Sequence, residues 1–329
     1  MKTRKLVVQV VAILAALIWS AVPALAQPTI TDLGTLGGAW SEANGINDGG
    51  QIVGASDTAS GEMHAYLWKN GIMTDLGALG GGTSYAYTIN NAGQIVGKSS
   101  TAAGDTHAFL WENGVMSDLG TLGGEWSEAY GINAAGQVVG ASSTAEGLIR
   151  AFLWQDGAMT DLGTLGGGEN QAYRINDPGQ VVGASATAAG EMHAFLWQNG
   201  AMTDLGTLGG RESYALGINA LGQVVGASKT AQGDKLHAFL WEDGTMTDLG
   251  TLGTGESYAW AINNRGQITG YSDTSNGQTH AFLWEGGVMA DLGTLDGKYS
   301  FAYAINNHGQ TVGASYTASR EEHACLWSP

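Results

Sequence analysis

Residues 118–124 read Asp-Leu-Gly-Thr-Leu-Gly-Gly, and this phrase returns along the chain with few changes. Its opening Asp-Leu-Gly stands at residues 32, 75, 118, 161, 204, 248 and 291, so the spacing is 43 residues with a single interval of 44. A fixed period of this length is typical of repeat architectures. Residues present in every copy are therefore expected to hold the repeat together, and function is expected where the copies differ.

Each period contains four short segments with the composition of β-strands. They are exemplified by Ser127–Asn133, Gln137–Ser142, His107–Trp111 and Met159–Leu162. Alternating or continuous runs of apolar and β-branched residues of this length favour strands, and no segment has a helical pattern long enough to compete. The sequence therefore predicts an all-β fold.

Two recurrent turn sequences connect these strands. Asn133-Ala134-Ala135-Gly136 has the Asn and Gly positions of a type I turn between the first and second strands. Asn113-Gly114 is typical of a two-residue type I′ hairpin between the third and fourth strands. Pro178 occupies the third position of its turn, where proline is disfavoured, so a different hairpin is expected there.

Four antiparallel strands in about 43 residues match one blade of a β-propeller. The last copy ends after its third strand, at Trp327, and the missing fourth strand is supplied by Thr29–Leu33 at the other end. Such complementation suits a closed ring, because closure removes exposed strand edges. We expect a single domain over residues 27–329, a seven-bladed β-propeller in which the N-terminal strand completes the last blade. The strands are too short for a membrane-spanning barrel.

The repeated His-Ala-Phe-Leu-Trp, together with Asp-Leu-Gly-Thr-Leu-Gly-Gly and Gly-Ile-Asn, resembles the HAF repeat of secreted bacterial proteins. The resemblance covers residues 27–329. It implies an extracellular repeat protein and no particular reaction. The third copy departs from the pattern, because Arg150 replaces His.

Residues 1–26 have the pattern of a secretory signal peptide. Lys2, Arg4 and Lys5 precede the apolar run Leu6–Trp19, and Ala24-Leu25-Ala26 forms an A-x-A cleavage site. The apolar run is too short for a convincing membrane anchor. We expect cleavage before Gln27 and a secreted protein, extracellular or periplasmic, with no membrane span.

Charge and cysteine content restrict the partners. The whole chain has a formal net charge of −17, and loss of the three basic groups of residues 1–26 makes it about −20. Such a surface repels nucleic acid and favours cationic partners. Cys325 is the sole cysteine, so no intrachain disulfide is expected. It stands where other copies have Phe or Tyr, which favours a buried apolar role.

The recurrent His invites a metal or catalytic interpretation, but its spacing favours a structural one. If Asn70-Gly71 forms the two-residue turn, His64 lies diagonally across the hairpin from Asp75, within reach of a hydrogen bond or ion pair. The third copy accepts Arg150 in this place, and two ligands per blade are too few for structural zinc. We expect one cation–carboxylate clamp per blade, with neither metal nor cofactor. The pairs are His64–Asp75, His107–Asp118, Arg150–Asp161, His193–Asp204, His237–Asp248, His280–Asp291 and His323–Asp32.

The copies diverge around the Ser or Asn that opens the first strand. Some present Trp with Glu there and others Glu with Tyr, a combination suited to stacking on a sugar or holding a cationic group. The alternative is an ordinary solvated rim. The candidate ligand-binding residues at the rim of the channel are Trp40, Glu42, Tyr85, Trp126, Glu128, Glu212, Tyr214, Glu256, Tyr258 and Tyr299.

We therefore expect a secreted, monomeric, non-catalytic propeller that binds an extracellular ligand, either a glycan or a cationic group, at the channel rim. The first alternative is a carbohydrate-active enzyme whose carboxylate pair is Glu42 with Glu128 or Glu212 with Glu256. The second is a structural or adhesive surface protein. A propeller fold is compatible with all three.

Overall fold

The computed structural model describes residues 28–329, and every element in this range is a β-strand. The predicted signal peptide, residues 1–26, and its cleavage site lie outside the described residues. No helix within residues 28–329 has the length and hydrophobicity needed to cross a membrane.

The strands recur in the predicted order. The first strands of the repeats are β2 (Gly37–Ile46), β6 (Gly80–Ile89), β10 (Gly123–Ile132), β14 (Gly166–Ile175), β18 (Gly209–Ile218), β22 (Ser257–Ile262) and β26 (Asp296–Ile305). The second strands are β3 (Ile52–Thr58), β7 (Ile95–Thr101), β11 (Val138–Thr144), β15 (Val181–Thr187), β19 (Val224–Thr230), β23 (Ile268–Asp273) and β27 (Thr311–Thr317). The third strands are β4 (Met63–Lys69), β8 (Thr106–Glu112), β12 (Ile149–Gln155), β16 (Met192–Gln198), β20 (Leu236–Glu242), β24 (Thr279–Glu285) and β28 (Glu322–Ser328). The fourth strands are β5 (Ile72–Asp75), β9 (Val115–Asp118), β13 (Ala158–Asp161), β17 (Ala201–Asp204), β21 (Thr245–Asp248), β25 (Val288–Asp291) and β1 (Thr29–Asp32).

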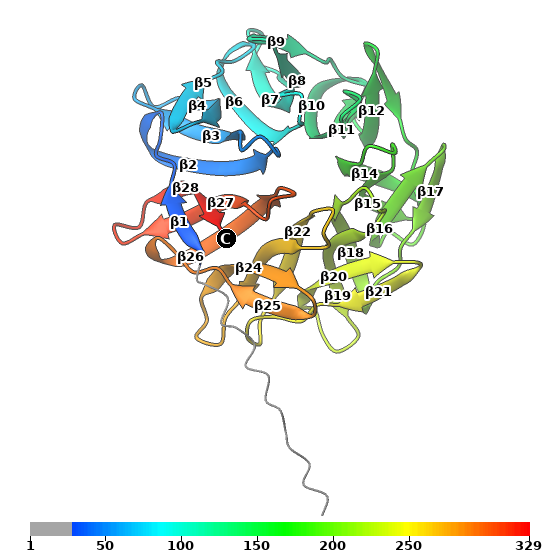
Figure 1. Ribbon diagram of the computed structural model, residues 1–329. Helices are drawn as coiled ribbons and strands as arrows, with labels where there is room; N and C mark the ends of the chain where they lie inside the picture. Colours follow the sequence, from blue (N-terminus) through cyan, green and yellow to red (C-terminus); the bar gives the residue numbers. More distant parts are fainter. Residues whose placement is uncertain (1–27) are drawn as a thin grey trace, which may run out of the picture.

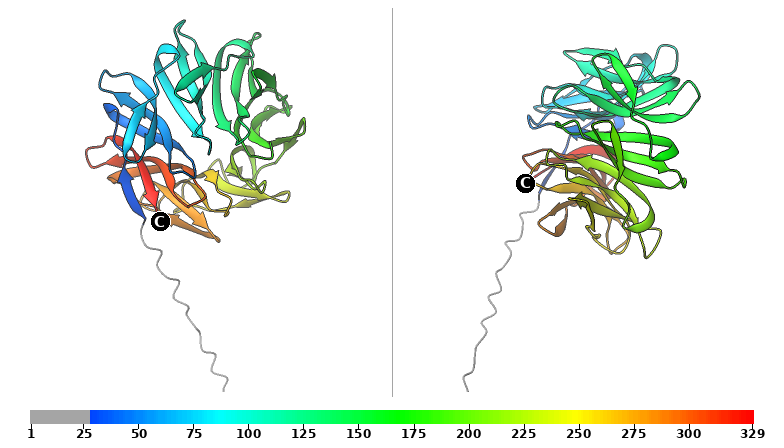
Figure 2. Two further views of the ribbon diagram at one scale, coloured as in Figure 1. Left: turned by 45° about the horizontal axis from the view of Figure 1, so that its top comes forward. Right: turned by 90° about the vertical axis from the view of Figure 1, so that its right-hand side faces the viewer.

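These strands form antiparallel four-stranded sheets arranged as a β-propeller around a central axis (Figures 1 and 2). A typical sheet has the order β2-β3-β4-β5. Two neighbouring four-stranded sheets are joined into a single eight-stranded sheet by one parallel bridge, between Trp126 and Thr106. The sheet β26-β27-β28-β1 takes its fourth strand from the N-terminal end, so β1 lies beside β28 (Figure 1).

The turn predictions can be compared with the backbone. Asn113 and Gly114 both have positive φ, 53° and 85°, which confirms the type I′ hairpin. The N–H of Gly136 donates to the carbonyl of Asn133, as expected for the other turn. The expectation of a different hairpin at Pro178 was wrong, because Gly179 still bonds to Asn176 at 3.0 Å. Proline merely lacks the extra N–H bond that the equivalent Ala135 donates to the side chain of Asn133.

The apolar core lies between neighbouring sheets. In one cluster, Val139 and Leu162 of the third repeat pack with Ile175 and Phe195 of the fourth. The recurrent Trp side chains are partly buried against such clusters, apart from Trp327, which is fully buried. A further cluster joins the two ends of the chain, because Leu33 and Val312 pack with Ile52 and Tyr66. Burial of these residues between sheets explains why the Phe and Trp of the motif recur.

Cys325 is fully buried in an equivalent cluster beside Ala302 and Trp327. Burial raises the pKa of its thiol well above the usual range. The thiol therefore stays protonated, as the apolar interpretation of this residue predicts.

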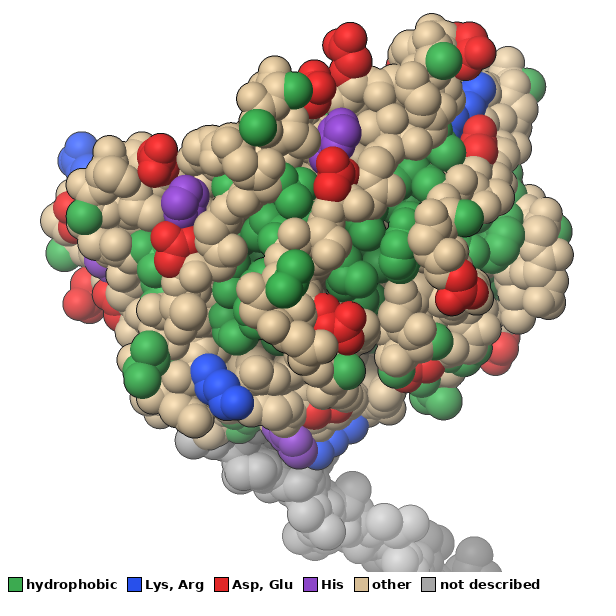
Figure 3. Space-filling view, turned by 90° about the horizontal axis from the view of Figure 1, so that it is seen from above, with side chains coloured by type: hydrophobic (Ala, Val, Ile, Leu, Met, Phe, Trp, Pro, Cys, Tyr) green, Lys and Arg blue, Asp and Glu red, His purple; other side chains and the backbone are tan. Residues whose placement is uncertain are grey.

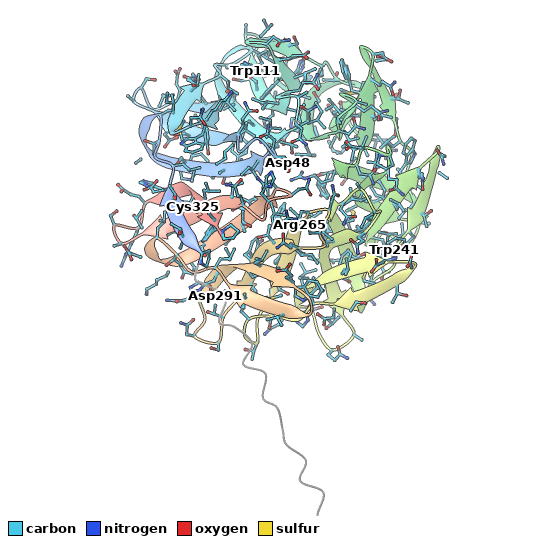
Figure 4. The ribbon with its side chains drawn as sticks, in the orientation of Figure 1. Asp48, Trp111, Trp241, Arg265, Asp291 and Cys325 are labelled. Atoms are coloured by element: carbon cyan, nitrogen blue, oxygen red, sulfur yellow. The ribbon has the colours of Figure 1, made fainter. Side chains whose placement is uncertain are left out.

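A ring of asparagines lines one end of the central channel. Each side-chain Nδ2 donates to the backbone carbonyl of the equivalent Asn in the next repeat at 3.0–3.2 Å, and Asn306 donates to Asn47. Asp48 adds a bond from the backbone N–H of Asn307, at 2.9 Å. Figure 4 shows Asp48 near the centre of the ring and Trp111, Trp241 and Asp291 nearer its periphery. These bonds link the first and last repeats at the axis.

Candidate functional site at the channel mouth

A β-bulge in the first strand of each repeat determines what faces the channel. In β10, Ala129 pairs with Gly140 and Gly131 pairs with Val139, so Tyr130 is an extra residue without a partner. The same shift occurs in all seven repeats. A bulge re-aims a side chain locally, which places these unpaired residues toward the axis.

A glycine is required opposite the bulge, because the backbones of the first and second strands approach each other closely there. A Cβ on Gly140 would lie 1.9 Å from the carbonyl oxygen of Glu128 and 2.8 Å from Cε1 of Phe152. No larger residue fits without moving the strand. The recurrent Gly of the second strand therefore permits the bulge that builds the site.

The re-aimed side chains surround a cavity of about 410 Å³ at the mouth of the channel opposite the asparagine ring. This volume lies within the range of small-molecule sites. The lining residues are Glu42, Asn44, Tyr85, Tyr87, Tyr130, Tyr173, Arg174, Leu216, Trp260, Tyr271, Phe301 and Tyr303.

Aromatic rings form two arcs around this cavity. In the first arc Tyr87 lies 5.2 Å from Tyr130, which lies 5.7 Å from Tyr173, between ring centroids. In the second arc Trp260 lies 5.8 Å from Tyr303, edge to face. These separations are those of favourable aromatic pairs. The arcs are interrupted where Asn44 and Leu216 replace an aromatic residue, so the cavity has one distinct orientation despite the repeat.

Glu42 supplies a carboxyl group on one side of the cavity. Burial raises its pKa to about 7, although a hydrogen bond from Asn44 opposes the shift. The amide of Asn44 is itself anchored, since its Nδ2 donates to the carbonyl of Ala86 at 3.2 Å. Glu42 is therefore poised to exchange a proton near neutral pH.

Arg174 supplies a cation deeper in the channel. Its Nη1 donates to the carbonyl oxygens of Tyr130 and Tyr173, both at 2.9 Å. Burial lowers the pKa of its guanidinium to about 10, so it remains charged at neutral pH. It lines the mouth cavity and also a narrower space of about 140 Å³ further along the channel.

Glu128 lies beside the first aromatic arc rather than in the cavity. It is 8% exposed, accepts a hydrogen bond from the hydroxyl of Tyr87 at 2.9 Å and pairs with Lys98 at 3.0 Å. Burial, followed by the charge of Glu128, raises the pKa of Tyr87 and Tyr130 above the usual range. Both tyrosines are therefore neutral hydrogen-bonding groups at any ordinary pH.

The structure separates the residues that the sequence grouped on a rim. Glu42 and Tyr85 line the cavity, whereas Trp126 lines another hollow with Met63, and Tyr299 lines a third with Tyr316. Trp40 is partly buried on β2 outside the cavity.

The remaining rim carboxylates have partners of their own. Glu212 pairs with Lys229 at 3.1 Å and accepts a longer bond from Tyr214, while Glu256 accepts one from Tyr258 at 3.4 Å. Tyr258 adjoins the cavity by packing against Tyr271, with centroids 4.9 Å apart. These side chains are engaged with neighbours rather than directed into one shared opening.

Sequence reasoning missed the residues that contribute most of the wall. They lie two positions beyond the residues it chose, as Asn44 follows Glu42 and Tyr87 follows Tyr85. The signal was present, because this position also varies among the copies. Arg174 was equally visible, since every other copy has Gly, Ala or Thr in its place.

The predicted clamp pairs are brought together far from this cavity, on the outer part of the blades. Nδ1 of each His lies 2.7–2.9 Å from its Asp, and Nε of Arg150 lies 3.6 Å from Asp161. The same Asp also accepts a backbone bond, as from Gly120 to Asp118 at 2.7 Å. Figure 3, a view onto the edge of the molecule, shows His side chains next to acidic ones. This arrangement is suited to fixing the turn after the fourth strand.

Comparisons with known proteins show the fold and nothing more specific. No protein family matches the sequence, and no curated protein matches it significantly. The β-propeller domain of the Trilobed protease from Pyrococcus furiosus, described as an open velcro topology, superposes with a TM-score of 0.59 at 8% identity and covers 88% of this chain and 95% of that one. The acylaminoacyl peptidase of Pyrococcus horikoshii superposes with a TM-score of 0.56 at 10% sequence identity. The match covers 90% of this chain and 52% of the peptidase chain. A puromycin-hydrolyzing peptidase of Mycobacterium tuberculosis superposes with a TM-score of 0.53 at 13% sequence identity, and the match covers 90% of this chain and 53% of the peptidase chain. The chain is thus similar in fold to β-propellers of solved structure.

Proposed function

We propose that the seven repeats form a closed seven-bladed ring. Three observations support closure: β1 pairs with β28, Leu33 packs with Tyr66, and Asn306 donates to Asn47. A closed ring has a defined axial channel, so a side chain that differs in one repeat has a fixed place relative to all the others.

We propose further that this is a secreted, non-catalytic binding protein of the HAF-repeat type and that it holds a glycan at the mouth of its channel. The signal sequence and the repeat motif support secretion. The observation that carries the binding proposal is the cavity of about 410 Å³, with its two aromatic arcs and few polar groups. Such a combination of large apolar walls and sparse, placed polar groups is typical of ligand sites.

A sugar fits this chemistry better than a purely apolar ligand. Its C–H face can pack on the rings of Tyr130 and Tyr173, while its hydroxyls can bond to Glu42 and Asn44. The tyrosine hydroxyls add neutral donors and acceptors, because burial raises the pKa of Tyr173 to about 12. The site therefore lies further inward than the rim predicted from the sequence.

The test is a screen of the processed protein against immobilised glycans, followed by calorimetric titration. Tyr130→Ala removes one wall of the cavity, and we expect it to weaken binding about tenfold or more, since a packed aromatic contributes both area and a specific contact. Trp126→Ala is the matched control, because Trp126 is an aromatic residue of the same strand that lies outside the cavity. Equal losses in the two variants would place binding elsewhere.

A second candidate function is glycoside hydrolysis with Glu42 as general acid. It is favoured by the pKa of about 7, because a carboxyl that is protonated near neutral pH can donate to a leaving group. Release of reducing sugar by the wild-type protein, lost in Glu42→Gln, would favour the enzyme over the binding module. Binding without turnover favours the binding module. The absence of both binding and turnover with every glycan tested favours a structural or adhesive role.

A further inference from the structure

Arg174 differs from every other residue at its position in the repeat. The equivalent residues are small or medium in size: Gly45, Thr88, Gly131, Gly217, Ala261 and Ala304. They are small because the inner edges of neighbouring strands nearly touch. A Cβ on Gly131 would lie 3.1 Å from the Cα of Arg174. The long side chain of Arg174 therefore has to occupy the channel itself.

The guanidinium is held in place but only partly bonded. Nη1 is engaged by the carbonyls of Tyr130 and Tyr173, which come from two neighbouring strands. Within residues 28–329 no hydrogen bond involves its Nε or Nη2. Three of the five N–H groups of an arginine thus remain for another acceptor.

No carboxylate among the described residues forms an ion pair with Arg174. By contrast, Lys98 pairs with Glu128 at 3.0 Å and Lys229 pairs with Glu212 at 3.1 Å. A buried charge without a counter-charge is costly. Among the described residues Arg174 has no such carboxylate partner, although the chain has a formal net charge of −17, and its side chain lines the cavity.

We propose that Arg174 binds a carboxylate of the ligand, so that the cavity selects acidic sugars such as hexuronates over their neutral counterparts. The inference rests on the proposed function, because it assigns the chemical class of the glycan. The planar fork of a guanidinium matches the two oxygens of a carboxylate. The pyranose ring of a hexuronate then packs on the tyrosine arc, with its hydroxyls toward Asn44 and Glu42. The acidic outer surface opposes binding of an acidic sugar only weakly, because charges are screened beyond about 8 Å at physiological ionic strength.

The experiment titrates the processed protein with galacturonic acid and galactose, and with the disaccharides of each in the same linkage. We expect the acidic sugar to bind about ten- to a hundredfold more tightly than its neutral partner, the range for a charge-assisted contact. Arg174→Gln should abolish this preference, while its amide N–H₂ can still bond to a carbonyl and preserve the fold. Arg211→Gln is the control, because the side chain of Arg211 is 85% exposed and does not line the cavity.

The outcomes of this titration, with thermal melting as a second readout, separate the possible failures. Equal affinity for acidic and neutral sugars in the wild type, or an undiminished preference in Arg174→Gln, overturns the inference and leaves the glycan-binding proposal standing. Binding of neither class overturns both proposals. If Arg174→Gln is too unstable to titrate, thermal melting of the wild type decides: galacturonate should raise the melting temperature and galactose at equal concentration should not, and equal shifts contradict the inference.

Discussion

Ring closure can be tested by making the same substitution in a normal sheet and in the sheet that β1 completes. Leu33 follows β1, and Leu162 follows β13; each is 8% exposed. The N–H of Leu33 donates to Ala324 at 2.9 Å, and that of Leu162 donates to Ala151 at 3.0 Å. The two leucines differ mainly in that Leu33 reaches its sheet from the opposite end of the chain.

Replacing a buried Leu with Ala costs about 2–5 kcal/mol, from lost transfer free energy and from the cavity left behind. Leu33 packs with Ile52 and Tyr66, and Leu162 packs with Val181 and Phe195, so the two cavities are similarly lined. If β1 is as firmly part of its sheet as β13, Leu33→Ala and Leu162→Ala should lower the free energy of unfolding by amounts within about 1 kcal/mol of each other. With an unfolding entropy of about 2.1 cal/mol/K per residue, 1 kcal/mol corresponds to about 1.6 °C in this domain.

The assay is urea unfolding followed by tryptophan fluorescence, with thermal melting as a second measure. Leu205→Ala, also at 8% exposure, gives the spread expected among ordinary sheets. A loss for Leu33→Ala well below that of both controls would mean that β1 detaches before the ring unfolds. The closure proposal would then be wrong, and deletion of residues 28–36 should leave a monomeric protein with an unchanged melting temperature rather than an aggregating one.

Three further predictions follow from the geometry. Gly140→Ala should cost about 3 kcal/mol or more in unfolding experiments, because its Cβ would lie 1.9 Å from a carbonyl oxygen, whereas Gly168→Ala, with no atom near, should be nearly neutral. Asp118→Ala should lower the free energy of unfolding by about 1–2 kcal/mol, because the hydrogen bonds to His107 and Gly120 are lost. His107→Arg should lower it by less. Equal losses in the two variants would mean that His has a specific chemical task. Glu42 binds its proton more tightly in the folded protein than in the unfolded chain. The free energy of unfolding should therefore fall as pH rises from about 4.5 to 7, by at most about 3 kcal/mol. Glu42→Gln should remove this part of the pH dependence. A pH profile unchanged by Glu42→Gln would contradict the burial of that carboxyl group.

The repeat made the backbone predictable. The spacing of Asp-Leu-Gly gave the length of the repeat, and the composition of the segments within it predicted four strands per period. Asn113-Gly114 predicted the hairpin and with it the position of Asp118 opposite Phe109. These features depend on local turn chemistry and on the two-residue period of strands, both of which are written in the sequence. Turn propensity was insufficient at Pro178, where the bonds of Asn176 to Gly179 and Gln180 maintain the usual hairpin against the preference of one residue.

The site was less predictable, because it depends on a departure from regular pairing. Simple alternation along β10 fixes how Glu128 and Tyr130 point relative to each other, but not where the strand gains a residue over its partner. That point depends on Gly140, where a Cβ would lie 1.9 Å from the carbonyl oxygen of Glu128, a close approach that exists only once the two strands are paired. The bulge recurs in every repeat, so the ring presents equivalent positions to the channel, and the residues placed there decide its chemistry. Among the described residues that line the mouth cavity Arg174 is the only cation, and together with Glu42, Asn44 and Leu216 it makes the wall of the cavity asymmetric despite the repeat.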